Sequence, residues 1–456
     1  MRVLLIQPPI SPIDFAAGRL VLNEPLALEI IGACAPNCEV RILDMRLDDD
    51  LERELDAFQP NIVATTSYTA GVYAALAAIK KVKMYNQHIL TVVGGHHATL
   101  MPEDFNRDFI DVIVIGEGEV TFAGLMEAYQ AKGDLNEVKG LAFPQNGKLV
   151  LTPAREIIGD LDAAPFPDRN LTKKYRHHYF RGTWQPIASL YTSRGCPYRC
   201  DFCAMWKVYR GKYRVRDPER VADELAGIEE DYIDVVDDNT LQDVSRAERM
   251  YQAIKERGIR KKYKVYARSD TIVKNPEIIE KWREIGLELI LIGFESFRDK
   301  ELRAHKKQNT VKNNEEAIHI LHANGLEIAA YFLIDPNYTV SDFLALGDYV
   351  ERLELTHPVF TILTPFPGTE LFEKRYTELT NLNYELFDFC HSVLPTKLPI
   401  EIFHECLANL YRRCYDTDKN RQERKSVVSR TTGEQFYRGF LEGYKDYEKI
   451  ARSSFD

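Results

Sequence analysis

Three cysteines within eight residues are the part of this sequence with the clearest chemistry. Cys196, Cys200 and Cys203 lie in SRGCPYRCDFC with a C-x3-C-x2-C spacing. Thiolates are soft ligands that suit zinc or iron–sulfur clusters. A structural zinc normally takes a fourth Cys or His, whereas a four-iron cluster held by three cysteines keeps one iron open. No second knuckle follows Cys203, so the spacing predicts a 4Fe–4S cluster, with zinc as the minor alternative.

A regular alternation of strands and helices surrounds this motif. Buried-strand patterns recur at 187–193, 232–237, 264–267, 287–295, 326–334 and 358–364, separated by segments of helical period. Six βα units in a row predict a parallel barrel or partial barrel over residues 186–369. Because the cysteine motif follows the first strand, we expect the cluster on the first loop beyond the strand ends.

An earlier α/β pattern occupies residues 1–140. Apolar runs at 3–6, 40–43, 61–65, 89–95 and 111–116 alternate with helical segments, which predicts a doubly wound parallel sheet. Ligands of such sheets bind beyond the carboxyl ends of the strands, and polar or glycine-rich residues follow each run here. Residues 141–185 are interpreted as a connector with some β structure, and residues 370–456 as a helical domain and tail.

Size and charge narrow the class of protein. A chain of 456 residues suits two or three domains. Its net charge of -10 argues against a nucleic-acid partner, which usually requires a basic domain or stripe. No signal-peptide pattern and no apolar run of about 18 residues are present. We therefore expect a cytoplasmic enzyme.

The motif C-x3-C-x-aromatic-C, with Phe202 as the aromatic residue, resembles the radical S-adenosylmethionine superfamily of partial six-stranded barrels. The resemblance implies that the open iron chelates the amino and carboxylate groups of S-adenosylmethionine. An electron from a donor such as flavodoxin or ferredoxin then yields a 5′-deoxyadenosyl radical. By position, residues ending the second strand would bind the methionine amine, Arg268 the carboxylate, and Glu295 with Ser296 the ribose. The implied contacts are Phe202, Asp237, Asp238, Asn239, Arg268, Glu295 and Ser296.

A doubly wound domain placed before such a barrel resembles the cobalamin-dependent class of these enzymes. GGHHATLMP (94–102) and GEGEVTF (116–122) are similar to the N-terminal signatures of that class. The implied cobalamin contacts are Asp44, Arg46, Thr66, Ser67, Tyr68, Gly94, Gly95, His97, Gly116 and Glu117. Arg46 stands where a D-x-H-x-x-G motif would have its cobalt-binding histidine. Either cobalamin binds without that histidine or the domain has lost the cofactor. The glycine-rich edge favours binding, because it permits the backbone to approach a ligand closely.

This resemblance implies radical methylation of an unactivated sp3 carbon through methylcobalamin, with the two cofactors meeting at the domain interface. The run of motifs is most similar to the hopanoid C-3 methylase branch, through ILDMRL, TVVGGHHATL and SRGCPYRCDFCAMWK. A lipid or another small molecule is the expected substrate. Two alternatives stay open. One is a cobalamin-assisted cyclase, ring-contraction or oxidation enzyme, for example on a tetrapyrrole, and the other is a non-enzymatic cobalamin sensor or electron relay.

The C-terminal tail has an aromatic stripe at helical spacing. Phe436, Phe440, Tyr444 and Tyr447 would share one face of a helix. Packing of this face on the protein body is the expected arrangement. Peripheral contact with a membrane is the alternative, because interfacial helices share this combination of aromatic and basic residues.

Overall fold

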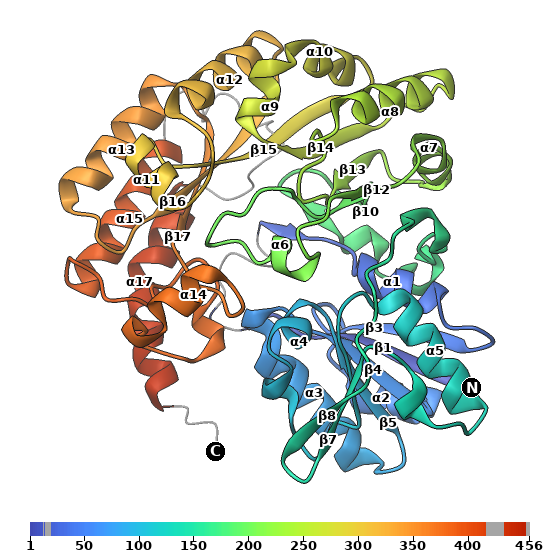
Figure 1. Ribbon diagram of the computed structural model, residues 1–456. Helices are drawn as coiled ribbons and strands as arrows, with labels where there is room; N and C mark the ends of the chain where they lie inside the picture. The colour runs from blue at the N-terminus through green and yellow to red at the C-terminus, as the bar shows by residue number, and fades with distance from the viewer. Residues whose placement is uncertain (12, 14–19, 416–432, 453–456) are drawn as a thin grey trace. The chain divides into compact units, whose positions relative to one another are not determined.

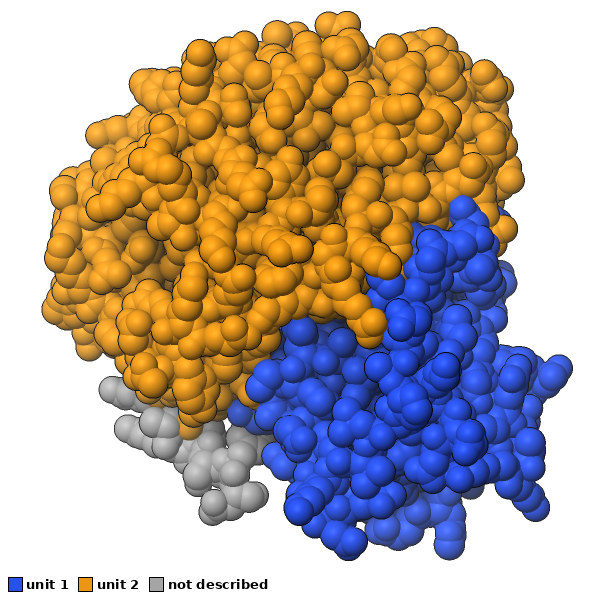
Figure 2. Space-filling view, in the orientation of Figure 1, with its two compact units in different colours: residues 1–12, 24–176 blue, residues 13–23, 177–456 orange. Residues whose placement is uncertain are grey.

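The computed structural model describes residues 1–456 except 12, 14–19, 416–432 and 453–456 (Figure 1). The chain divides into two compact units (Figure 2). Unit 1 contains residues 1–12 and 24–176, and unit 2 contains residues 13–23 and 177–456. Within the described ranges, none of the helices has both the length and the apolar character needed to span a membrane.

Unit 1 is a doubly wound sheet, as predicted. Its five parallel strands follow the order β3-β1-β4-β5-β6, so the order reverses between β1 and β4. Apart from the exposed first half of β3, these strands are mostly buried on both faces, as parallel strands covered by helices are. The strands are β1 (Arg2–Gln7), β3 (Glu39–Asp44), β4 (Ile62–Thr66), β5 (Leu90–Gly94) and β6 (Val112–Val114). The helices are α1 (Leu26–Ala33), α2 (Leu51–Phe58), α3 (Val72–Tyr85), α4 (His96–Leu100) and α5 (Gly118–Gln130).

The sheet of unit 1 extends beyond the boundary that we predicted at residue 140. β7 (Leu141–Gln145) pairs antiparallel with β6, and β8 (Lys148–Leu151) pairs antiparallel with β7. Leu141 and Phe143 are buried in the core of unit 1. The hairpin is the β structure expected in the connector, and it belongs to this sheet, which was not predicted because one short pair of strands does not continue the strand–helix rhythm.

We predicted residues 141–185 as a connector, but in the structure the residues after the hairpin, up to 176, also belong to unit 1. Buried Glu24, just before α1, binds Arg169 at 2.5 Å and Arg176 at 2.6 Å. The Tyr175 hydroxyl accepts a hydrogen bond from the Asp44 N–H. Charged groups far apart in sequence thus hold this segment against unit 1, which no local pattern indicates.

Unit 2 contains the predicted six-stranded partial barrel. All six strands are parallel and adjacent in chain order. They are β10 (Ile187–Leu190), β13 (Tyr232–Val235), β14 (Lys262–Ala267), β15 (Leu287–Glu295), β16 (Glu327–Ile334) and β17 (His357–Ile362). The connecting helices lie along the outer side of the sheet (Figure 1). They include α7 (Pro218–Gly227), α8 (Val244–Glu256), α10 (Pro276–Glu284), α12 (Val311–Ala323) and α13 (Val340–Arg352).

Residues 20–23 and 180–181 complete unit 2 although they lie outside the predicted barrel range. β2 (Val21–Leu22) pairs with β9 (Phe180–Arg181). Behind this pair, buried Asp234 on β13 accepts hydrogen bonds from Asn23, Arg181 and Lys264 at 3.1, 2.8 and 2.7 Å. Although burial disfavours its charge, Arg181 and Lys264 lower the pKa of Asp234 to about 2. The buried Asp234 carboxylate therefore binds two segments that are distant in sequence, one with Asn23 and one with Arg181.

The helical region predicted for residues 370–456 packs on unit 2 and belongs to the same compact unit. Residues of α15 (Ile400–Tyr415) and α17 (Gly433–Arg452) share the core of the barrel strands. Phe440 stacks on Tyr411 with ring centres 4.7 Å apart, and the Tyr447 hydroxyl donates to the Ser392 carbonyl. The aromatic stripe thus packs on the protein body, while the Phe436 side chain lies outside the described residues.

Candidate active site

The cysteine motif lies on a loop closed at its base by a short antiparallel pair. β11 (Ser193–Arg194) pairs with β12 (Arg214–Val215), so the residues between them form one excursion beyond β10. At its start Gly195 has φ +88, and a Cβ there would lie 2.1 Å from the carbonyl oxygen of Lys212. Only glycine permits this approach, so closure of the loop depends on Gly195.

Two predicted ligand residues fasten this loop to the end of β13. Asp237 Oδ1 accepts hydrogen bonds from the N–H groups of Thr192 (2.6 Å) and Ser193 (2.9 Å), and Asp238 Oδ2 accepts one from Gly195 (2.7 Å). Asp237 is buried, whereas Asp238 keeps exposed surface. Desolvation by the surrounding protein raises the pKa of Asp238 to about 6. Asp237 therefore positions the loop, and Asp238 has an oxygen left for a ligand.

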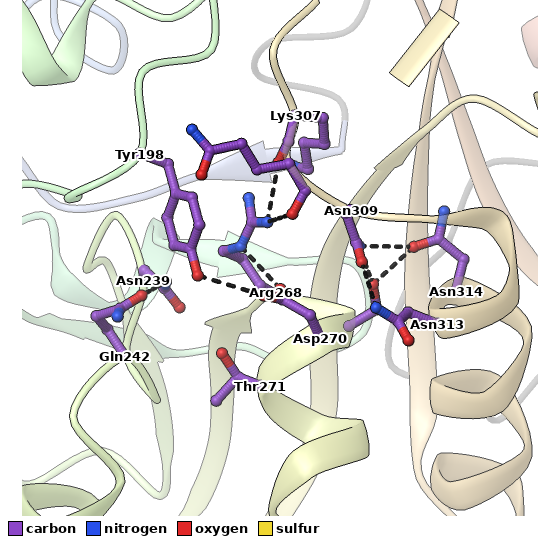
Figure 3. A network of polar contacts seen from close by, with 12 residues as sticks. Tyr198, Asn239, Gln242, Arg268, Asp270, Thr271, Lys307, Asn309, Asn313 and Asn314 are labelled. Carbon is purple, nitrogen blue, oxygen red and sulfur yellow. Dashed lines mark hydrogen bonds and ion pairs between the residues drawn. The ribbon is translucent and has the colours of Figure 1, made fainter. Parts of the chain in front are cut away.

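Asn239 presents an unsatisfied acceptor beside this strand end. Its Nδ2 donates to Gln242 Oε1 at 2.7 Å (Figure 3). Its Oδ1 is buried and has no hydrogen-bond partner in the described part of the chain. A buried oxygen without a donor costs about 1–3 kcal/mol, which a bound N–H group would recover. Asn239 is therefore suited to accept from the amino group of S-adenosylmethionine.

The three thiols form a donor set that favours a cluster over a single metal ion. Burial raises the pKa of Cys196 and Cys200, and it raises the pKa of Cys203 to about 12. The thiolates therefore need positive charge from a bound metal. A structural zinc normally takes four ligands, and this motif supplies three. A four-iron cluster takes each thiolate on a different iron, so it fits these cysteines better than zinc.

Arg268, which follows β14, joins the cysteine loop to the segment after α11 (Asp299–Ala304). Its Nε donates to Asp270 Oδ1 at 2.9 Å, and its Nη2 donates to the Lys307 carbonyl at 2.9 Å (Figure 3). Its guanidinium lies 3.5 Å from the centre of the Tyr198 ring, between the first two cysteines. Arg268 therefore holds the cysteine loop in position, and the predicted pairing with the methionine carboxylate would be a second role of the same side chain.

Glu295 ends β15 in a backbone conformation that is uncommon for its residue type. Its φ is +64, and the register with β16 shifts between Gly293 and Glu295. The carboxylate accepts a hydrogen bond from Lys307 Nζ at 2.8 Å. A Cβ on Gly293 would lie 2.2 Å from that carboxylate. Left-handed non-glycine residues cluster at functional sites, so this geometry supports the predicted ligand contact.

Two other predicted contacts are engaged within the protein. The Ser296 hydroxyl donates to Glu301 Oε2 at 2.5 Å, at the start of α11. Phe202 meets the His305 ring edge-on, with ring centres 5.9 Å apart. Ser296 directly follows β15 and Phe202 lies in the cysteine loop, and each already contacts another side chain of the protein.

Lys307 and Tyr198 are site residues that the sequence did not reveal. Lys307 is buried and binds Glu295, while Tyr198 carries Arg268 on its ring. An aromatic residue inside the C-x3-C spacing could have drawn attention to Tyr198. No short-range spacing connects Lys307 with Glu295, so only the fold brings that pair together.

In unit 1, Gly94, Gly95 and Gly116 form what we call the glycine crest, at the carboxyl ends of β5 and β6. Gly95 has φ +100, and a Cβ there would lie 2.5 Å from Thr66 Oγ1 and 2.9 Å from the Ser67 nitrogen. Gly116 has φ +86, and a Cβ there would meet nothing within 4 Å. The crest therefore packs closely on one side and leaves backbone open on the other, as a broad planar ligand requires.

Arg46, at the position of the missing histidine, is folded back onto its own strand end. Its Nε and Nη2 donate to the two carboxylate oxygens of Asp44 at 2.8 and 2.6 Å. Asp44 is buried and Arg46 nearly so. Asp44 and Arg46 thus neutralise one another, and neither offers a nitrogen ligand for cobalt.

His97 is also engaged within unit 1. Its Nδ1 lies 3.1 Å from Thr69 Oγ1, its Nε2 lies 2.9 Å from Asp104 Oδ2, and the ring is buried. Glu117 accepts a hydrogen bond from the Ile158 N–H at 2.8 Å. Tyr68, after β4, is 64% exposed. Tyr68 is therefore the most exposed of the predicted cobalamin contacts.

Two family models match this chain. The model described as B12 binding domain matches residues 19–126, and the model described as Radical SAM superfamily matches residues 190–350. The hopanoid C-3 methylase of Methylococcus capsulatus is 32% identical over 414 residues, which cover 89% of this chain and 78% of that protein.

Solved structures share the fold across both units. The cobalamin-dependent radical enzyme OxsB, with aqua-cobalamin and S-adenosylmethionine bound, superposes with a TM-score of 0.71 at 15% identity, covering 99% of this chain and 80% of OxsB. The methyltransferase TsrM of Kitasatospora setae, with cobalamin and a 4Fe–4S cluster bound, has a TM-score of 0.70 at 17% identity, covering 99% of both chains.

Proposed function

This chain belongs to the cobalamin-dependent radical S-adenosylmethionine methyltransferases, and we propose that it methylates an unactivated sp3 carbon of a polycyclic lipid such as a hopanoid. Its cofactors are a 4Fe–4S cluster, S-adenosylmethionine and cobalamin. The observation that carries the substrate proposal is the similarity to the hopanoid C-3 methylase along 89% of this chain.

We assign the S-adenosylmethionine end of the reaction to unit 2. Cys196, Cys200 and Cys203 would hold the cluster, which supplies the electron for cleavage of the sulfonium. Asn239 Oδ1 is the orphan acceptor for the amino group. Asp238 adds a second acceptor, and its raised pKa lets it share a proton with that amine near neutral pH.

Arg268, Lys307 and Glu295 are the charged side chains that set the charge balance around the proposed cluster. The two cations lower the pKa of the Cys196 and Cys200 thiols against the dominant effect of burial. Glu295 neutralises Lys307 directly. We propose that the ribose hydroxyls bind Glu295 from the side that Lys307 leaves open, while Arg268 keeps the loop that bears Tyr198 in place.

The glycine crest would hold cobalamin in unit 1 without a histidine below the cobalt. Arg46 is bound to Asp44 and His97 to Asp104, so neither is available as that ligand. We propose that the backbone at Gly95 and Gly116 supports the corrin or its nucleotide tail, with Ser67, Tyr68 and the other predicted crest residues around it.

We further propose a cytoplasmic location and a separate protein as electron donor. Contact with a membrane would serve to collect a lipid substrate. The aromatic stripe of α17 does not support such contact, because Phe440 and Tyr447 already pack on unit 2. Any lipid surface would have to be met elsewhere.

An anaerobic reaction with hopanoid-containing lipid extract, cobalamin and methyl-labelled S-adenosylmethionine tests the proposal by mass spectrometry. We expect a labelled methyl group on the lipid, together with 5′-deoxyadenosine and S-adenosylhomocysteine. Deoxyadenosine without S-adenosylhomocysteine would contradict methyl transfer and favour a cyclase or oxidation enzyme. No cleavage of S-adenosylmethionine at all would favour a sensor or relay. Labelled product from a tetrapyrrole but not from hopanoids would contradict the lipid substrate.

A further inference from the structure

A turn in the connection between α11 and α12 contacts three parts of the site, although none of its residues was among the predicted ligand contacts. We call residues 305–308 the hub turn. The Lys307 N–H donates to the Leu302 carbonyl at 2.9 Å, which closes the end of α11. Helix ends of this kind usually have glycine at the residue with positive φ, yet here Lys306 has φ +53 and Gln308 has φ +52. Left-handed residues other than glycine persist only where the surrounding structure fixes them.

His305 joins the hub turn to the cysteine loop. Its Nδ1–H donates to Asp201 Oδ1 at 3.0 Å, and the Asp201 N–H donates to the His305 carbonyl at 3.3 Å. Asp201 directly follows Cys200 and is only 3% exposed. A buried carboxylate needs hydrogen-bond donors, because burial removes those that water supplies. The residue next to a predicted cluster ligand is thus held to the hub turn by both its side chain and its backbone.

The same turn binds the two side chains that are proposed to contact the ribose and the methionine carboxylate. Lys307 Nζ donates to Glu295 Oε1 at 2.8 Å. The carbonyls of Lys307 and Gln308 accept hydrogen bonds from Arg268 Nη2 at 2.9 and 3.1 Å (Figure 3). Glu295 therefore meets a side chain of the turn, and Arg268 meets its backbone. A displacement of the turn would move both contacts together.

We propose that Asp201 and His305 are positioning residues whose hydrogen bond fixes the cysteine loop relative to Arg268 and Glu295, an inference that rests on the proposed function. Neither residue would touch S-adenosylmethionine. Their role is to hold the open iron of the cluster and the two polar contacts at one spacing, so that a single bound molecule reaches all of them. Groups that act together on one molecule lose much of their combined effect when they are misplaced by about 1 Å.

Lys374 provides a contrast at the same carboxylate. It lies on α14 (Glu370–Arg375), its Nζ is 3.6 Å from Asp201 Oδ2, and its side chain is 54% exposed. Exposed ion pairs contribute little, because water and salt screen them. If Asp201 acts through position, loss of the Lys374 charge should matter little, whereas loss of the His305 hydrogen bond should matter much.

The test measures cleavage of S-adenosylmethionine by the full-length, cluster-loaded protein, with dithionite as the reductant. His305→Leu removes the N–H donor and keeps the three cysteines, Arg268 and Glu295. We expect KM for S-adenosylmethionine to rise about 10-fold while kcat stays within about threefold of wild type. The iron content should not change, whereas a general loss of fold would lower both iron content and kcat. His305→Asn keeps an N–H near the position of Nδ1 and should restore most of the affinity.

Three variants complete the test. Lys374→Met is the matched control, because it removes a charge beside Asp201 without removing the hydrogen bond, and it should keep the wild-type KM. Asp201→Ala should raise KM as His305→Leu does. The double variant of Asp201→Ala and His305→Leu should be no worse than either single variant, because both substitutions remove the same hydrogen bond.

The other outcomes would overturn the inference. Wild-type KM in both His305→Leu and Asp201→Ala would do so directly. Equal effects of His305→Leu and Lys374→Met would show that charge matters instead of position. Additive effects in the double variant would mean that the two residues act separately, and a loss of iron that accounts for the lost activity would mean that they serve cluster assembly. If wild type itself does not cleave S-adenosylmethionine, the proposed function is refuted, whereas cleavage by wild type with unaltered variants refutes this inference alone.

Discussion

Replacing the three crest glycines with alanine, one at a time, distinguishes the effect of backbone strain on stability from the effect of cofactor contact on cobalamin binding. Gly95 has φ 100 and ψ −175, a region open essentially only to glycine. A Cβ there would also lie 2.5 Å from Thr66 Oγ1 and 2.9 Å from the Ser67 nitrogen. Gly116 has φ +86 with open space around its Cβ position, and Gly94 has ordinary contacts, the nearest at 3.5 Å.

These geometries predict a graded loss of stability. Gly95→Ala combines strain of about 1–3 kcal/mol with overpacking of about 1–3 kcal/mol, so we expect a loss of about 4 kcal/mol. Gly116→Ala carries only the strain, about 1–2 kcal/mol. Gly94→Ala should stay within about 1 kcal/mol of wild type, because alanine also restricts the unfolded chain.

Urea unfolding of the cobalamin-free protein, followed by circular dichroism, measures these losses. Hydrogen exchange of peptides from β4 and β5 assigns them to unit 1. Cobalamin retention after gel filtration supplies the functional readout. Gly116→Ala should lose cobalamin more than its small destabilisation explains, because its methyl group enters open space over the crest. Full cobalamin retention by a stably folded Gly116→Ala protein would refute the crest as the cofactor site.

Three further predictions concern unit 2. Cys203→Ala should abolish the cluster absorbance and the cleavage of S-adenosylmethionine while leaving the far-ultraviolet circular dichroism unchanged; retained cleavage would exclude Cys203 as a ligand. Lys307→Met should leave the partly buried carboxylate of Glu295 unpaired, which should cost about 3 kcal/mol in urea unfolding and weaken S-adenosylmethionine binding in equilibrium dialysis. Unchanged affinity would contradict the proposed ribose contact. Although burial opposes its charge, Asp388 and then Asp446 raise the pKa of His391 from 6.5 to about 9. The imidazolium therefore contributes about 3 kcal/mol below pH 6.5, and this is lost as the pH rises through 9. The stability deficit of His391→Gln should shrink by that amount between pH 6 and pH 10, and a constant deficit would refute the assignment.

The parts of the site that sequence predicted well are those that depend on local spacing. The cysteine motif follows the first barrel strand, and the glycine-rich segments follow β5 and β6, as the apolar runs indicated. Both sheets have the predicted parallel core because buried parallel strands leave a continuous apolar signature. The hairpin of β7 and β8 lacked that signature, so it was assigned to the connector instead of to this sheet.

The roles of the polar residues depended on partners that are distant in sequence. Asp237 was expected to meet a ligand, yet its carboxylate holds the backbone of the cysteine loop. Arg268 was expected to meet the methionine carboxylate, and it first binds Tyr198 and the carbonyl of Lys307. A polar residue at a strand end has several possible partners, and sequence does not rank them.

By itself, the sequence determined the spacing of the three cysteines, the order of the two α/β units and the absence of a histidine at Arg46. Covalent spacing and hydrophobic period are properties of the chain alone, so they can be read before folding. Only the tertiary structure decided that Arg46 is bound to Asp44 and that Lys307 neutralises Glu295. Charge balance is a sum over groups that only folding brings together.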